Sequence, residues 1–300
     1  MMKRAALTTQ KQIFFVLVIF FYLLTSKAYA IYQNNHQTKV IAPSHVILGD
    51  PFLIKILNLD KKTGFTIEWL GKKIDFLENS SNNVQLILGS DVRRNLPGLK
   101  ILSIYGKNFY IEKKIILKKR KLSITKIQVA KKYMNLSKLT LKRYLKEKKL
   151  LKKILSTFTP QKLYEPHFIP PINPFKITSP YGRCRIINGI KKSIHTGIDI
   201  KARPNTKVRA INSGKVLYCG DFLFSGKSIF IDHGQGIISM YFHLNKIIVK
   251  QGQMIKKGQI IGLSGSTGRV SGPHLHLGIS IFGKMVDPEK LINNIVFQQF

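Results

Sequence analysis

The chain has 300 residues, and its 50 Lys and Arg residues against 14 Asp and Glu residues give a formal net charge of +36 at pH 7. This length suits about two domains, and a hydrophobic content of 44% supplies enough apolar side chains for buried cores. Such a charge favours an anionic partner, either nucleic acid, anionic lipid or a cell-wall polymer. The absence of a zinc-finger or RNA-binding signature argues against nucleic acid.

Residues 1–30 have the pattern of a signal peptide. Basic residues precede an apolar run of 12 residues from Ile13 to Leu24, and the sequence Ala28-Tyr29-Ala30 resembles a signal-peptidase site. Crossing a bilayer takes ~20 apolar residues, so the run is short for an anchor. We therefore expect the leader to be removed, with an uncleaved anchor as the alternative, and no later segment to span a membrane. The mature chain is then exported to the periplasm or cell envelope.

Residues 38–122 alternate short β-type runs with turn residues. Regular short strands of this kind predict a small β-sandwich-like accessory domain. The turns fall at sites such as Pro97-Gly98, and the segment holds no cluster of catalytic residue types. The expected strands lie within residues 51–57, 65–70, 83–89, 99–106 and 109–117.

Residues 128–158 predict a basic amphipathic helix. Between Gln128 and Ser156 there are ten lysines and arginines but a single acid, Glu147. Apolar residues recur at helical spacing, so one face is expected to dock on a neighbouring domain while the lysines stay solvated. The alternative is a helix that also touches an anionic surface. Five prolines within residues 159–174 then predict a linker. The apolar face consists of Leu141, Tyr144, Leu145, Leu151, Ile154 and Leu155.

The chain has two cysteines, Cys184 and Cys219. An exported location permits a disulfide between them, but the sequence does not determine their distance. Two thiols without a CxxC spacing are a poor metal site. The sequence therefore leaves their pairing open.

Five of the eight histidines lie within residues 175–295. His195 stands four residues before Asp199, and positions i and i+4 share a face in a strand and in a helix alike. In GPHLHLG, the period-2 alternation places His274 and His276 on one face of a strand. An imidazole, a carboxylate and a further imidazole make a typical three-ligand zinc set with one open coordination position.

The combination of these motifs resembles peptidase family M23, the lysostaphin/LytM-type zinc metallopeptidases that cut peptidoglycan peptides. HTGID, YFHL at residues 241–244 and GSTGRVSGPHLHLGI at residues 265–279 look like the HxxxD, xHL and GPHLH motifs of that family. The resemblance covers roughly Ile177 to Ile292. It implies a mainly β protein, in which an antiparallel β-sheet metallopeptidase domain over residues 175–295 follows the accessory domain and the basic helix.

The resemblance also implies roles for five residues. His195, Asp199 and His276 would hold Zn²⁺, and His243 and His274 would be the catalytic pair beside the metal-bound water. The implied function is an exported zinc endopeptidase that cleaves peptidoglycan cross-links or stem peptides through a metal-activated water. The alternative is a non-catalytic envelope adaptor that regulates other cell-wall hydrolases, because some relatives lack the metal ligands. All five positions are filled here, which favours the enzyme.

The other histidines are expected to have no role in this site. His233, within IDHGQG, is interpreted as a structural turn residue. His36, His45 and His167 have no evident partners in the sequence and are expected at the surface or in loops. The glycine-rich run 262–272 lacks the Lys-Ser/Thr ending of a P-loop, so it predicts tight turns that let a peptide approach the backbone.

Overall fold

A computed structural model of the chain describes residues 38–60, 63–77, 81–127, 137–187, 189 and 191–298. The expected leader and the first part of the predicted basic helix, residues 128–136, lie outside these ranges. Within them, no helix combines the length and the apolar character that a membrane crossing requires. The described chain is mainly β with antiparallel sheets, as the sequence predicts.

The described residues form two compact units, each made of several separate stretches of the chain. The domain boundaries at 38–122, 128–158, 159–174 and 175–295 stay predictions. The smaller unit contains the described residues up to Val40, Ile56–Val84 and Ser103–Glu112. The larger unit contains Ile41–Lys55, Gln85–Leu102 and the described residues from Lys113 onward.

Two sheets contain the strands between Lys39 and Lys118, in the orders β1-β3-β6 and β2-β8-β7-β4-β5. The five expected strands are β3, β4, β6, β7 and β8. The short strands β1 and β2 and the longer β5 lie outside the expected ranges. β5 pairs with β4 through a two-residue turn at Leu70 and Gly71, both with positive φ. Such turns favour Asn-Gly, so leucine at the first position concealed the hairpin. The bounds are β1 Lys39–Ile41, β2 His45–Ile47, β3 Phe52–Leu57, β4 Phe65–Trp69, β5 Lys72–Phe76, β6 Val84–Leu88, β7 Gly98–Gly106 and β8 Phe109–Lys118.

Helix α2 spans Lys138–Leu155. It begins after Ser137, whose side chain accepts a backbone N–H of the first turn, as an N-cap does. Ile154 is buried, whereas Leu141 and Leu145 are 43% and 53% exposed. The predicted apolar face is therefore covered mainly along its C-terminal half.

The proline-rich segment at residues 159–174 belongs to the larger unit and contributes buried side chains to it. Tyr164, Phe168 and Ile172 are buried at 5%, 1% and 4% exposure. The prolines restrict the backbone of the segment, and the apolar side chains between them enter the core. A segment read from its prolines as a linker is thus part of a folded unit.

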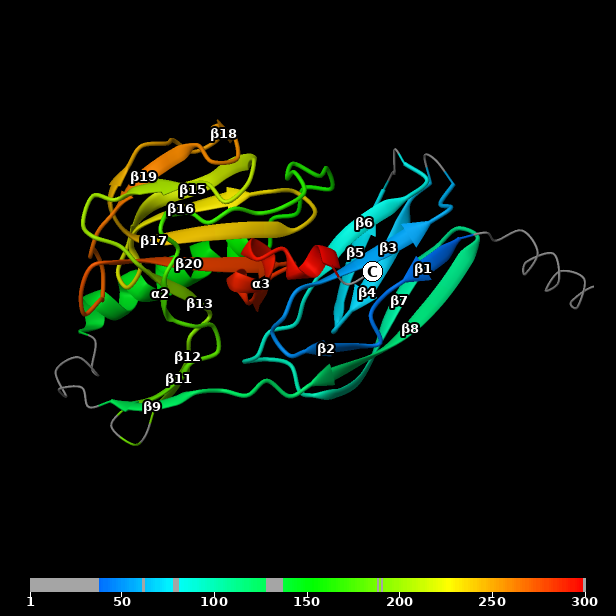
Figure 1. Cartoon of the computed structure of the whole chain (residues 1–300), viewed down its shortest axis with the longest axis horizontal. Coiled ribbons are helices and arrows are strands. Elements are labelled where there is room, and N and C mark those ends of the chain that lie inside the picture. Colours follow the sequence, from blue (N-terminus) through cyan, green and yellow to red (C-terminus); the bar gives the residue numbers. More distant parts are fainter. Residues whose placement is uncertain are drawn as a thin grey trace, which may run out of the picture. The chain divides into compact units, whose positions relative to one another are not determined.

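A large antiparallel sheet in the order β10-β13-β20-β17-β16-β15-β18 forms the centre of the larger unit (Figure 1). β14 pairs with β19, β19 also pairs with β17, and β21 pairs with β20. The bounds are β10 Ile177–Ser179, β13 Gly197–Lys201, β14 Lys207–Arg209, β15 Gly214–Phe222, β16 Gly226–Asp232, β17 Ile237–Ile247, β18 Met254–Ile255, β19 Ile260–Ser264, β20 His274–Ile281 and β21 Lys284–Val286, followed by helices α3 Pro288–Ile292 and η2 Ile295–Gln298.

A separate small sheet contains β9 (Ile124–Ile127), β11 (Cys184–Ile187) and β12 (Lys191–Ile194), in the order β12-β11-β9. Cys184 is buried in β11 and Cys219 lies in β15; both are free thiols. The disulfide that export would permit is therefore not formed in this structure.

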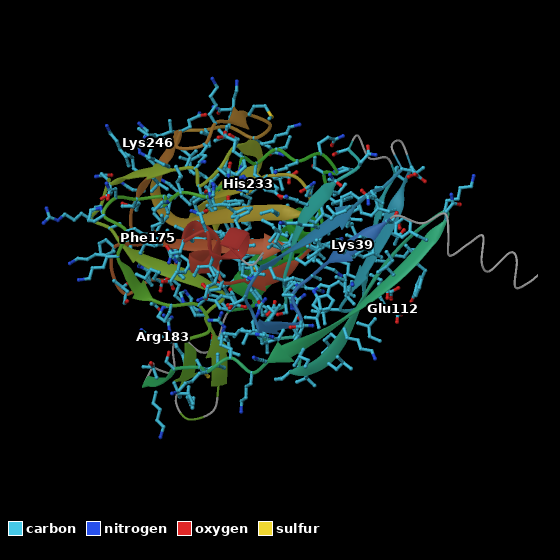
Figure 2. The ribbon with its side chains drawn as sticks, turned by 45° about the vertical axis from the view of Figure 1, so that its right-hand side comes forward. Lys39, Glu112, Phe175, Arg183, His233 and Lys246 are labelled. Atoms are coloured by element: carbon cyan, nitrogen blue, oxygen red, sulfur yellow. The ribbon has the colours of Figure 1, made fainter. Side chains whose placement is uncertain are left out.

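His233 is a buried core histidine (Figure 2). Its Nδ1 lies 2.7 Å from the carbonyl oxygen of Ser213, and its Nε2 lies 2.7 Å from Ser239 Oγ. A carbonyl only accepts hydrogen bonds, so Nδ1 carries the proton. Burial lowers the pKa of His233 to about 4, so the ring is neutral at pH 7. These contacts give His233 a structural role, in accord with the sequence interpretation.

Candidate metal centre

The pairing of β13 with β20 places three of the predicted site residues on one face of the sheet. Asp199 pairs with His276, and Lys201, two residues further along β13, pairs with His274. Side chains of paired residues point to the same face of a sheet. Leu275 and Leu277 point to the opposite face and are fully buried. The alternation in GPHLHLG thus separates a core face from the face that holds the predicted site residues.

His195 lies in the turn before β13 and completes a cluster with Asp199 and His276. Its Nε2 is 3.1 Å from Asp199 Oδ1 and 3.1 Å from His276 Nδ1. Asp199 Oδ1 is 2.8 Å from His276 Nδ1. The three side chains are 9%, 13% and 12% exposed, respectively. The three predicted ligands therefore direct their donor atoms to a single, mostly buried point.

This donor set fits zinc. Ligand atoms at about 2.0–2.2 Å from a tetrahedral zinc ion lie roughly 3.3 Å from one another. The donor atoms here are 2.8–3.1 Å apart, so a displacement of roughly a few tenths of an ångström accommodates the ion. His195 Nδ1 lies 3.0 Å from the carbonyl oxygen of Pro180, which places the proton on Nδ1 and leaves Nε2 as the ligand atom.

Two neighbours determine the position of the His276 ring. Phe242 stacks on it with ring centroids 5.3 Å apart and an interplanar angle of 4°. On the other strand, a Cβ atom at Gly197 would lie 2.6 Å from His276 Nε2, closer than any real contact. The glycine of HTGID is thus required by the space that the ligand ring occupies.

The protonation states of the cluster suit a metal. Burial raises the pKa of Asp199, but hydrogen bonds from His195 and His276 and their charges lower it further, so the pKa lies well below its usual range. For His276, burial lowers the pKa more than the hydrogen bond to Asp199 raises it. An ionised carboxylate and a neutral imidazole are the forms that bind metal ions.

Arg185, in β11, is a further site residue that the sequence analysis did not single out. Its Nη2 lies 3.7 Å from Asp199 Oδ2, the carboxylate oxygen that faces away from the histidines. No periodicity connects Arg185 with the histidine motifs, and only the tertiary structure brings β11 beside β13. Its positive charge further favours the ionised form of Asp199.

His243 reaches the same face through a β-bulge. Two residues of β17, Phe242 and His243, stand opposite a single residue of β16, Ser228. His243 has a φ of 63°, in the left-handed region. In a regular strand its side chain would point away from the face that Phe242 occupies, and the extra residue reverses this direction.

His243 and His274 form a pair beside the cluster, with ring centroids 4.9 Å apart. His243 Nδ1 lies 2.9 Å from Thr267 O, and His274 Nδ1 lies 2.8 Å from Gly272 O. Both partners are carbonyl oxygens, so both histidines are protonated at Nδ1 when neutral and keep Nε2 as the basic atom. His274 Nε2 is 3.7 Å from Asp199 Oδ1. Burial lowers the pKa of His243 to about 4.

The structure thus brings all five predicted site residues to one face of the sheet. The remaining described histidines lie elsewhere: His45 Nδ1 is 3.2 Å from Ser44 Oγ, and His167 packs edge-on against Phe297. His36 falls outside the described residues.

Several curated proteins with matching sequences are named as peptidases. Over 96 residues the chain is 41% identical to the peptidoglycan DD-endopeptidase ShyA of Vibrio cholerae, and over 121 residues it is 38% identical to the DD-carboxypeptidase/endopeptidase Mpg of Neisseria meningitidis. These matches cover 32% and 40% of this chain. They span 22% and 28% of the two relatives, so the chain matches about a quarter of their length.

A solved structure shares more of the chain. A crystal structure described as a peptidase M23 from Pseudomonas aeruginosa aligns with a TM-score of 0.65 and 26% sequence identity. The alignment covers 83% of this chain and 95% of that chain. Residues 193–288, which contain all five predicted site residues, match peptidase family M23. By their motifs and by the geometry of the site, residues 193–288 form a domain of peptidase family M23.

Proposed function

We propose that this protein is an exported zinc endopeptidase that cleaves peptide bonds in peptidoglycan cross-links or stem peptides. The observation that carries the proposal is the convergence of two imidazoles and one carboxylate on a single point, with a second pair of imidazoles beside it. The relatives named as peptidoglycan DD-endopeptidases support the substrate class. The leader pattern at residues 1–30 supports export, because peptidoglycan lies outside the cytoplasmic membrane.

The five side chains divide the chemistry between them. His195, Asp199 and His276 would hold the zinc ion, which when bound supplies a Lewis acid for a peptide carbonyl and lowers the pKa of water to about 7. His243 and His274 are placed to take a proton from the nucleophile at Nε2 and to return one to the leaving amine. In their protonated form they donate hydrogen bonds to a developing oxyanion.

The adaptor alternative finds less support. A protein that only regulates other wall hydrolases needs neither metal ligands nor an acid–base pair. This chain keeps both, and Phe242 and Gly197 fit closely around the ring of one ligand, His276. Such positioning is useful for metal binding and has no evident purpose in an adaptor.

Metal removal tests the proposal. The mature protein, beginning after Ala30, is incubated with purified peptidoglycan sacculi, and the released fragments are identified by mass spectrometry. We expect about one zinc ion per chain, loss of fragment release on chelation and recovery when zinc is added back. Release that survives complete zinc removal would contradict the metal mechanism. A zinc-loaded protein that releases nothing would favour the adaptor.

We also propose that the solvent side of α2 binds an anionic envelope surface. Exposed lysines recur there every three or four residues, and like charges at this spacing repel one another along a helix. The first turn has no acidic residue to favour the helix dipole. This arrangement costs helix stability, which an external anionic partner offsets. We call these residues the lysine stripe: Lys138, Lys142, Lys146, Lys149 and Lys153.

Sedimentation with sacculi tests the lysine stripe. Replacing Lys142, Lys146 and Lys149 by glutamine is expected to reduce binding at low salt several-fold and to flatten its salt dependence, while cleavage of a soluble peptide is unchanged. A matched control removes the same charge from exposed lysines of the β8 region, Lys114, Lys118 and Lys119. Equal losses in both triple variants would show that overall charge, and not the stripe, binds the surface.

A further inference from the structure

We infer that helix α2 positions His243, through Glu147 and Tyr144 as positioning residues. The helix, Lys138–Leu155, lies outside the family match at residues 193–288. The role of His243 rests on the proposed function. The positioning role of α2 goes beyond that function, because it makes a segment before the peptidase domain part of the active-site framework. The connection runs through the turn between β15 and β16, residues 223–225, here called the β15–β16 turn.

Glu147 is the only acid in α2, among seven lysines and one arginine. One of its oxygens, Oε2, accepts a hydrogen bond from the backbone N–H of Leu223 at 2.9 Å. The other, Oε1, accepts from Arg143 Nε at 2.7 Å, and the side chain is 17% exposed. The carboxylate therefore binds the backbone of the β15–β16 turn through a charge-assisted hydrogen bond, which is stronger than a hydrogen bond between neutral groups.

Tyr144 holds the next residue of the turn. Its ring packs edge-on against Phe224, with centroids 5.4 Å apart and an interplanar angle of 64°. Phe224 also contacts the guanidinium of Arg269, whose Cζ is 4.2 Å from the ring centroid. The backbone N–H of Arg269 donates to Phe224 O at 2.9 Å. Phe224 thus links the helix to the loop that contains Thr267 and Arg269.

The turn and this loop hold His243 from two sides. The backbone N–H of His243 donates to Ser225 O at 2.9 Å. Its ring Nδ1 lies 2.9 Å from Thr267 O. Thr267 is itself tied to β16, because its Oγ1 accepts from Lys227 N at 2.9 Å. Both the bulged backbone and the imidazole of His243 therefore depend on where these two segments lie.

The two segments touch through their backbones. Gly226 and Gly268 have φ values of 59° and 78°. A Cβ atom at Gly268 would lie 2.6 Å from Phe224 O, and one at Gly226 would collide with the backbone of Thr267. With no flexible side chain between the segments, a displacement of the turn is transmitted directly to the loop.

Paired substitutions in the full chain test the inference. Glu147→Ala and Tyr144→Ala are each expected to lower kcat about tenfold on a soluble peptidoglycan peptide, with KM and zinc content little changed, since small misplacements of reacting groups reduce rate strongly. Glu147→Gln keeps an oxygen acceptor and Tyr144→Phe keeps the ring, so both conservative variants are expected to restore most of the rate. Lys148→Ala, on an exposed position of α2, is the matched control.

Amide hydrogen exchange gives a readout that does not depend on activity. In Glu147→Ala, the N–H groups of His243 and Arg269 are expected to exchange at least about tenfold faster, while amides of β20 keep their protection. Unchanged exchange at these two amides would overturn the inference. So would kcat values in both alanine variants equal to that of the Lys148→Ala control. If the wild type fails to cleave peptidoglycan, the proposed function fails, and the exchange rates still decide the positioning role.

Discussion

His276→Ala is expected to lose bound zinc and peptidoglycan cleavage together. Four-ligand structural zinc sites bind with roughly 10–16 kcal/mol, so one ligand contributes roughly 3 kcal/mol, or an affinity loss on the order of 10²-fold. The loss of zinc affinity is larger at this position because the His276 ring also fills the space between Phe242 and Gly197. Zinc per chain is measured by elemental analysis after dialysis, and cleavage by release of soluble fragments from sacculi.

A second ligand variant separates metal binding from packing. Asp199→Asn keeps the size of the side chain and removes the charge that the two histidines stabilise, so the fold is expected to be kept while zinc affinity falls. His45→Ala, an exposed histidine of β2, is the control for loss of an imidazole elsewhere. If His276→Ala and Asp199→Asn both kept one zinc ion per chain, the assignment of the ligands would be wrong.

His243→Ala is expected to keep zinc and to lose turnover. Acid–base side chains typically contribute a factor of about 10²–10⁴, so kcat is expected to fall by that range while zinc per chain stays near one. The physical reason is the position of His243, whose ring lies 4.9 Å from that of His274 and is outside the cluster of ligand atoms. The measurement compares kcat, KM and zinc content for the wild type and the variant on one soluble peptide.

His274→Ala is the companion variant for this prediction. If the two histidines act as a unit, the double variant is expected to be little slower than either single variant. A His243→Ala protein with full activity would remove His243 from the catalytic pair. A His243→Ala protein without zinc would instead make His243 part of the metal centre.

Local sequence patterns determined much of the fold. Short runs of strand-forming residues bounded by turn residues located β3, β4, β6, β7 and β8, because both preferences arise in the local geometry of the backbone. The same local geometry explains why the spacing of HTGID and of GPHLHLG was informative. Residues two apart on a strand share a face wherever that strand lies, so the sequence by itself placed His274 and His276 together.

Only the tertiary structure decided the remaining features of the site. The register of β13 against β20 brings Asp199 opposite His276, and the bulge in β17 turns His243 to their face. Register and bulges depend on pairing between distant segments, which no local period encodes. Likewise, the helical spacing of apolar residues predicted α2, but only packing showed that Glu147 accepts a hydrogen bond from the β15–β16 turn. The sequence determined which side chains are candidates for the site; long-range pairing and packing decided how they meet.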